Sequence, residues 1–155
     1  MSRILILGYG NPLRSDDGLG WQAAVELFRA NRTPDVEVLP CHQLTPELAK
    51  AVSRSETVLF IDCTRDGKPG EVRCAELEPH SSSPSFTHDL NPAALLALSA
   101  ELFGTHPTAF LLTICGENFE PGEALSATVS RQLQILKGRV RQIVQETLLT
   151  TTVHR

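Results

Sequence analysis

Several features that mark other protein classes are scarce or missing in this sequence of 155 residues. Its four cysteines are far apart and form no CxxC pair, so neither a disulfide framework nor a structural zinc site is indicated. No apolar run approaches the roughly 20 residues that span a bilayer, and no signal-peptide pattern opens the chain. We therefore expect a cytoplasmic protein with reduced thiols that does not contact a membrane.

The chain also lacks an excess of positive charge. It has 14 Lys and Arg against 18 Asp and Glu, for a formal net charge of -4. A generic nucleic-acid binder needs a basic face to neutralise phosphates, and this balance argues against that class. The hydrophobic content of 41% and charged content of 21% are ordinary for a soluble globular domain.

Strand-like and helix-like segments alternate along the chain. We expect strands at 3–8, 36–39, 57–62, 71–77 and 108–115, and helices at 18–30, 46–53, 92–103 and 122–149. The alternating pattern of 71–77 suits an antiparallel edge strand. This order predicts a single α/β domain at 1–150, a three-layer sandwich with a mostly parallel twisted sheet and helices on both faces. Residues 151–155 are expected to be a disordered tail.

The most informative segment is GYGNPLRSDDGLG, residues 8–20, directly after the first expected strand. Its first three residues are half of a dinucleotide-binding fingerprint, but Leu13 stands where the third glycine should be. Two carboxylates at a helix start would also repel a phosphate. We therefore expect no nucleotide cofactor, and a metal cation or cationic group suits Asp16 and Asp17 better.

Acidic residues from two strands should meet at one edge of the sheet. Parallel strands share their carboxyl ends, so Asp16 and Asp17 should lie on the same side as Asp62, and His88 follows a serine-rich loop near that edge. Two carboxylates and one imidazole form a ligand set for a divalent transition metal with an open position. Each residue has an ordinary structural interpretation too: Asp16 as a helix cap, Asp62 as a partner of loop amides or Arg65, and His88 as a cap or solvated residue. Together they favour a functional site.

Other residues near this edge offer weaker alternatives. Cys63 and Cys115 end expected strands, and either could serve as a nucleophile beside His88, although cysteine is most often a small core residue. His42 either lines the crevice or belongs to a surface loop. The loop at 116–122 is expected to frame one wall, with its carboxylates in solvent.

The motifs together resemble a known family. The segments GYGNPLRSDDGLG, VLFIDC (58–63) and GENFEPGEALS (116–126), with His88 between them, are similar to the hydrogenase maturation endopeptidases, and HQLTPELA (42–49) resembles one subgroup. The resemblance spans nearly the whole chain. It implies removal of a short C-terminal extension from the precursor of a nickel-iron hydrogenase large subunit, after nickel insertion. It also implies that Asp17, Asp62 and His88 are the metal-contacting and catalytic residues, with Asp17 standing where many relatives have glutamate.

The resemblance further implies that the nickel belongs to the substrate rather than to a permanent site. The peptide bond would then be hydrolysed by a water that the metal polarises or that a carboxylate deprotonates, as in an aspartic-type enzyme. Two alternatives remain: a chaperone-like protein that inspects the metal loading of a partner without hydrolysis, and a hydrolase that uses Cys63 or Cys115. Leu13, Leu19 and Trp21 are the candidates for an apolar interface with a protein substrate.

Overall fold

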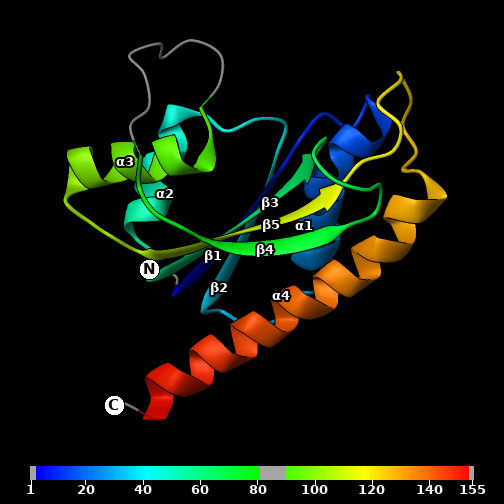
Figure 1. Cartoon of the computed structure of the whole chain (residues 1–155). Helices are drawn as coiled ribbons and strands as arrows, with labels where there is room; N and C mark the ends of the chain where they lie inside the picture. The colour runs from blue at the N-terminus through cyan, green and yellow to red at the C-terminus, as the bar shows by residue number, and fades with distance from the viewer. Residues whose placement is uncertain (1–2, 81–89, 154–155) are drawn as a thin grey trace.

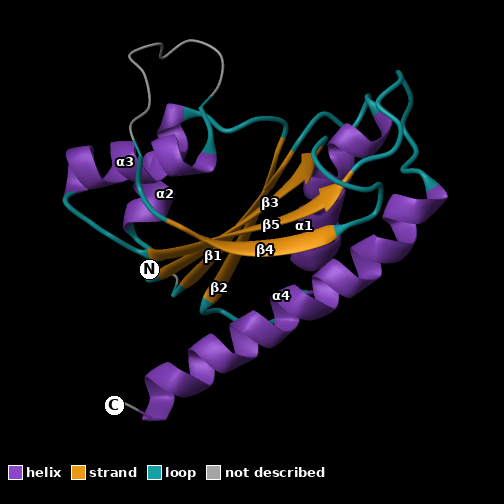
Figure 2. Ribbon diagram, viewed as in Figure 1, coloured by secondary structure: helices purple, strands orange, loops and turns teal. Residues whose placement is uncertain are grey.

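The computed structural model describes residues 3–80 and 90–153, and it contains one sheet between two layers of helices (Figure 1, Figure 2). The strands are β1 (Ile4–Tyr9), β2 (Val36–Cys41), β3 (Thr57–Thr64), β4 (Val72–Leu77) and β5 (Thr108–Cys115). The helices are α1 (Leu19–Ala30), α2 (Ala49–Ser53), α3 (Pro92–Phe103) and α4 (Ala127–Val153), with short 3-10 turns η1 (Ser15–Gly18) and η2 (Pro46–Leu48).

The five strands follow the order β2-β1-β3-β5-β4. Strand β1 pairs in parallel with β2 and β3, and β3 pairs in parallel with β5. Strand β4 pairs antiparallel with β5 at the edge. The predicted fold class, a mostly parallel α/β sheet with helices on both faces and one antiparallel edge strand, is confirmed.

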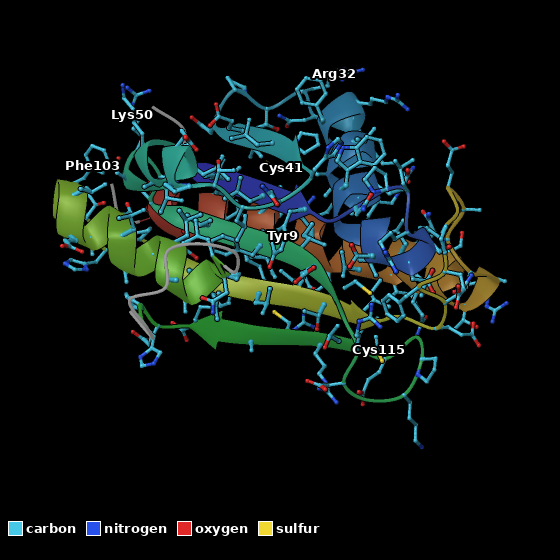
Figure 3. The ribbon with its side chains drawn as sticks, turned by 90° about the horizontal axis from the view of Figure 1, so that it is seen from above. Tyr9, Arg32, Cys41, Lys50, Phe103 and Cys115 are labelled. Atoms are coloured by element: carbon cyan, nitrogen blue, oxygen red, sulfur yellow. The ribbon has the colours of Figure 1, made fainter. Side chains whose placement is uncertain are left out.

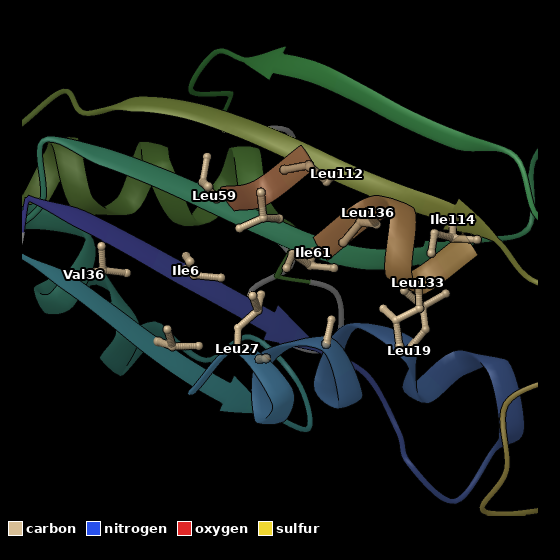
Figure 4. Packing of buried hydrophobic residues seen from close by; sticks show 14 of the residues in the cluster. Ile6, Leu19, Leu27, Val36, Leu59, Ile61, Leu112, Ile114, Leu133 and Leu136 are labelled. Carbon is tan, nitrogen blue, oxygen red and sulfur yellow. The ribbon is translucent and has the colours of Figure 1, made fainter. Parts of the chain in front are cut away.

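Alternate residues of β1 enter two separate cores. Ile4 and Ile6 belong to a cluster formed with α1 and α4, part of which is shown in Figure 4, whereas Leu5 and Leu7 belong to a cluster formed with α2 and α3. All four side chains are buried. A strand that is covered on both faces has no solvent side, and this explains why its sequence is a continuous apolar run instead of an alternating one.

Helix α4 differs most from its expected bounds. It begins at Ala127, five residues later than predicted, and continues without a break at Gly138 to Val153. The helix therefore enters the segment that we expected to be a disordered tail, and residues 154–155 lie outside the described part of the chain. Within residues 3–80 and 90–153, no helix has both the length and the hydropathy needed to cross a membrane.

Candidate active site

The sheet changes its direction of winding between β1 and β3. From β1 the chain passes through α1 to β2 on one side, whereas β3 lies on the other side of β1. Open α/β sheets bind their ligands at such a point, beside the carboxyl ends of the strands. Here Asp17 lies in η1, after β1. Asp62 lies near the carboxyl end of β3, two residues before the strand ends.

Asp62 is largely buried and titrates abnormally. Burial raises its pKa to about 6, and the negative charge of Asp17 adds to the shift, although hydrogen bonds from the Tyr9 hydroxyl and the Cys63 N–H favour the charged form. The bond from the Cys63 N–H to Oδ1 of Asp62 is 2.7 Å long. Turn η1, which carries Asp17, contacts strand β3, which carries Asp62, so the charge of Asp17 acts across that contact. A carboxyl group with such a pKa can take up a proton near neutral pH.

Tyr9 is a neighbour of Asp62 that the sequence analysis did not identify. Burial, together with the charge of Asp62 and the hydrogen bond to it, raises the pKa of the Tyr9 phenol far above its ordinary value. The phenol therefore remains a proton donor that orients the Asp62 carboxylate. Side chains of a strand point alternately to its two faces, so Tyr9 lies on the same face as Leu5 and Leu7 and packs against the α2–α3 core. This alternation in the sequence could have predicted the burial of Tyr9.

Asp17 is partly exposed and accepts fewer hydrogen bonds than Asp62. Its Oδ2 accepts a hydrogen bond of 3.0 Å from the Asn11 N–H, and no described residue donates to its other oxygen. Two neighbouring carboxylates with few donors between them suit a bound cation, which would supply the missing positive charge. The same pair could also bind and deprotonate a water molecule.

Asp16 has a different role from its neighbour. It is fully buried, and its carboxylate accepts hydrogen bonds from the backbone N–H groups of Glu117, Asn118 and Ser126 and from the Ser126 hydroxyl, at 2.7–2.9 Å. Burial alone would raise the pKa of Asp16, but these donors hold it below the ordinary value. We expected Asp16 to cap its own helix; instead it holds the loop between β5 and α4.

This contact explains the late start of α4. The Ser126 hydroxyl accepts a hydrogen bond from the Val129 N–H, so Ser126 is the N-cap of the helix. The same hydroxyl donates to Asp16, and the residues between 116 and 126 are held as a loop. A serine directly before an apolar helical pattern was the sequence signal for this boundary, and the sequence analysis missed it.

The turn that carries the acidic pair needs an unusual backbone. Gly10 has a φ of 148°, and a side chain there would overlap the backbone of Asp17. Ser15 has a φ of 51°, a conformation that costs a residue other than glycine about 1–3 kcal/mol. Its N–H donates to the Gly122 carbonyl at 2.8 Å and its hydroxyl to the Glu120 carbonyl at 2.7 Å. The loop after β5 therefore holds the turn in place.

The three apolar interface candidates lie in different environments. Leu13 is 59% exposed, in agreement with an interface role, and Trp21 is half-buried with its ring 6.2 Å from that of the exposed His42. The expectation for Leu19 was wrong, because its side chain is fully buried in the α1–α4 core near Leu133, as Figure 4 shows. His42 is exposed, directly after β2.

The third predicted ligand, His88, lies outside the described residues. Among the described residues, no group of three His, Cys, Asp or Glu side chains is arranged to hold a metal ion. The loop from 116 to 122 does frame the site, and its Glu117 and Glu120 side chains are exposed as predicted.

Cys63 does not have the environment of a nucleophilic thiol. All four cysteines are free thiols. Cys115, which is labelled in Figure 3, is buried at the end of β5. Burial, with the nearby charges of Asp62 and Asp17, raises the pKa of the Cys63 thiol to about 12. A nucleophilic thiolate needs the opposite shift.

Sequence comparisons find no match among protein-family models and none among curated proteins. Solved structures do resemble this chain. The NiFe hydrogenase maturation protease HycI from Thermococcus kodakarensis KOD1 is 24% identical with a TM-score of 0.75, and the alignment covers 93% of both chains. The hydrogenase maturating endopeptidase HybD from E. coli is 22% identical with a TM-score of 0.76, covering 94% of this chain and 93% of the other.

A hydrogenase 2 maturation peptidase from a Thaumarchaeota archaeon is also similar, with 20% identity, a TM-score of 0.72 and coverage of 93% of this chain and 99% of the other. These alignments extend over almost the full length of each protein, so the likeness includes the order of the strands and the helices on both faces. The chain therefore has the fold of the hydrogenase maturation endopeptidases.

Proposed function

We propose that this protein is an endopeptidase that removes the C-terminal extension of a nickel-iron hydrogenase large-subunit precursor after nickel insertion. The observation that carries the proposal is the convergence of Asp17 and Asp62 at the point where the sheet changes its winding direction. The fold shared with maturation endopeptidases and the motifs GYGNPLRSDDGLG and GENFEPGEALS support it.

The nickel in this proposal is part of the substrate. Asp17 and Asp62 offer carboxylate oxygens and His88 an imidazole nitrogen, and such a set binds a divalent transition metal less tightly than thiolates do. A weak and open site suits a metal that another protein already holds. The role of the pair is then to recognise the loaded precursor, with cleavage by a water that the metal polarises or a carboxylate deprotonates.

A cleavage assay tests this proposal. Nickel-loaded precursor and nickel-free precursor are each incubated with the wild type and with Asp17→Ala, Asp62→Ala and His88→Ala, and the precursor mass is followed. We expect the wild type to cleave the loaded form alone and the three variants to lose activity. Glu37→Gln, which changes an exposed carboxylate on β2, is the matched control and should cleave like the wild type.

Three outcomes contradict parts of the proposal. Full cleavage by all three alanine variants overturns the assignment of the site. Equal cleavage of nickel-free precursor overturns the recognition of nickel. A stable complex between the wild type and the loaded precursor, with no change of mass after long incubation, favours the chaperone-like alternative instead.

A further inference from the structure

Two arginines meet at one aromatic residue on the rim of the candidate site. The guanidinium carbon of Arg65, just after β3, lies 3.8 Å from the centre of the Phe119 ring. Arg14, in the turn before η1, donates from Nη2 to the Phe119 carbonyl oxygen at 3.4 Å. Arg65 is three residues after Asp62 and Arg14 three residues before Asp17. Two exposed guanidinium groups therefore come from segments next to the acidic pair, and the loop that carries Phe119 also presents the exposed carboxylates of Glu117 and Glu120.

The aromatic platform itself is held firmly. The Phe119 ring lies against Gly116, where an added Cβ would overlap the ring. The residue before it, Asn118, donates its N–H to Asp16, and the residue after it, Glu120, accepts the Ser15 hydroxyl through its carbonyl. The contacts that hold the acidic pair thus also fix the platform on which Arg65 stacks.

Both guanidinium groups are open to a ligand. Arg14 and Arg65 are exposed, and the ion pairs of the described residues involve other cations, namely Arg3, Arg73 and Lys137. A guanidinium that stacks by its face keeps its N–H edge free, and that edge matches a carboxylate in a bidentate pair. Stacking also restricts the side chain before binding, which lowers the entropy lost when a ligand is bound.

We propose that Arg14 and Arg65 bind a carboxylate of the substrate segment that is removed; this inference rests on the proposed function. The acidic pair attracts the cationic side of the substrate, whereas the arginines attract an anionic group of the same substrate. A segment that is cut off near the end of a polypeptide has a terminal carboxylate, and it carries any acidic side chains of its own. Opposite charges on the two sides of the scissile bond orient the substrate in one direction.

Steady-state cleavage of nickel-loaded precursor tests the inference with Arg14→Gln, Arg65→Gln and the double variant. We expect KM to rise about 3-fold to 5-fold for each single variant and about 10-fold or more for the double variant, with kcat within twofold of the wild type. Added salt should raise KM for the wild type and have little effect on the double variant, because salt screens exposed charges. Phe119→Leu keeps both charges but removes the aromatic face, and its KM should lie between those of the wild type and Arg65→Gln.

Arg54→Gln is the matched control, because Arg54 is an exposed arginine at the end of α2, beside the amino end of β3 and far from the site. Two precursor forms then identify the carboxylate: one with a C-terminal amide, and one with the acidic side chains of the extension changed to amides. The form that abolishes the difference in KM between wild type and double variant lacks the carboxylate that the arginines bind, and so identifies it.

The outcomes separate the inference from the proposed function. If the wild type cleaves the precursor while the double variant keeps the wild-type KM and salt dependence, the arginine site is wrong and the proposed function stands. If the wild type does not cleave the precursor at all, the proposed function fails and the inference falls with it.

Discussion

Two aspartates at one edge of the sheet, the fully buried Asp16 and the largely buried Asp62, have opposite electrostatic environments. Four hydrogen bonds to the carboxylate hold the pKa of Asp16 below its ordinary value despite complete burial. Burial with fewer donors, and with Asp17 nearby, raises the pKa of Asp62 to about 6. The number of donors, more than the depth of burial, decides which form of a buried carboxyl is stable.

This difference in hydrogen bonding distinguishes a carboxylate that stabilises the fold from one that can bind a ligand or a proton, although both lie at the same edge of the sheet. A carboxylate that is fully hydrogen-bonded stabilises the fold and has no free lone pairs for a ligand. A carboxylate that is buried with few donors costs folding free energy and is available to a cation or a proton. Asp16 is of the first kind and Asp62 of the second.

The largest expected effect is on activity and comes from Asp62→Asn. The amide keeps the shape, and its remaining oxygen can still accept from the Cys63 N–H, but it loses the charge, so kcat/KM for the loaded precursor should fall about 100-fold or more. Its free energy of unfolding should be equal to or above that of the wild type, because a poorly solvated charge is removed. Cleavage rates and urea unfolding measure the two quantities. A loss of several kcal/mol in the free energy of unfolding would contradict this and indicate that Asp62, like Asp16, has a structural role.

The next largest effect is on stability and comes from Asp16→Asn. One oxygen becomes an NH2 group that faces backbone donors, so at least one buried N–H loses its acceptor, and the free energy of unfolding should fall by about 2–3 kcal/mol. Urea unfolding at neutral pH measures the change. Glu37→Gln, on an exposed position of β2, should shift it by less than about 0.5 kcal/mol. A loss for Asp16→Asn as small as that of the control would contradict the proposed structural role.

A smaller effect depends on pH. Because the pKa of Asp16 is lowered in the folded state, its contribution to stability is fully present above the unfolded pKa of about 4 and is lost as the pH falls through the lower folded value. The stability difference between the wild type and Asp16→Asn should therefore be constant from pH 7 to 5 and shrink below about pH 4. Urea titrations at pH 7, 5, 4 and 3 test this, and a difference that stays constant down to pH 3 would be inconsistent with a lowered pKa.

The smallest effect is expected at Cys63. Its pKa of about 12 keeps the thiol protonated at neutral pH, so Cys63→Ala should cleave the loaded precursor at a rate within about twofold of the wild type. A thiol-blocking reagent should leave the activity of the wild type unchanged unless its bulk obstructs the crevice, and the alanine variant controls for that effect. Loss of cleavage in Cys63→Ala would revive the cysteine hydrolase hypothesis.

The elements of the fold and the meeting of Asp17 with Asp62 could be predicted because they depend on local pattern. Continuous apolar runs mark buried parallel strands, and parallel strands bring their carboxyl ends together. The burial of Leu19 could not be predicted in this way, because it depends on the packing of α1 against α4. The start of α4 had a local signal in Ser126, but the contact of Ser126 with Asp16, between the two ends of the chain, fixes the helix start there.

The bonds from Asp16 to Glu117, Asn118 and Ser126 join residues that are 101 to 110 positions apart in the sequence. Closing so long a loop is slow compared with forming local structure, and it requires that both ends be present. During synthesis, Asp16 leaves the ribosome early, but the groups that donate to its carboxylate belong to the last quarter of the chain. A nascent or truncated chain that ends before residue 117 therefore contains the acidic residues without the assembled edge, and the candidate site forms only when the rest of the chain follows.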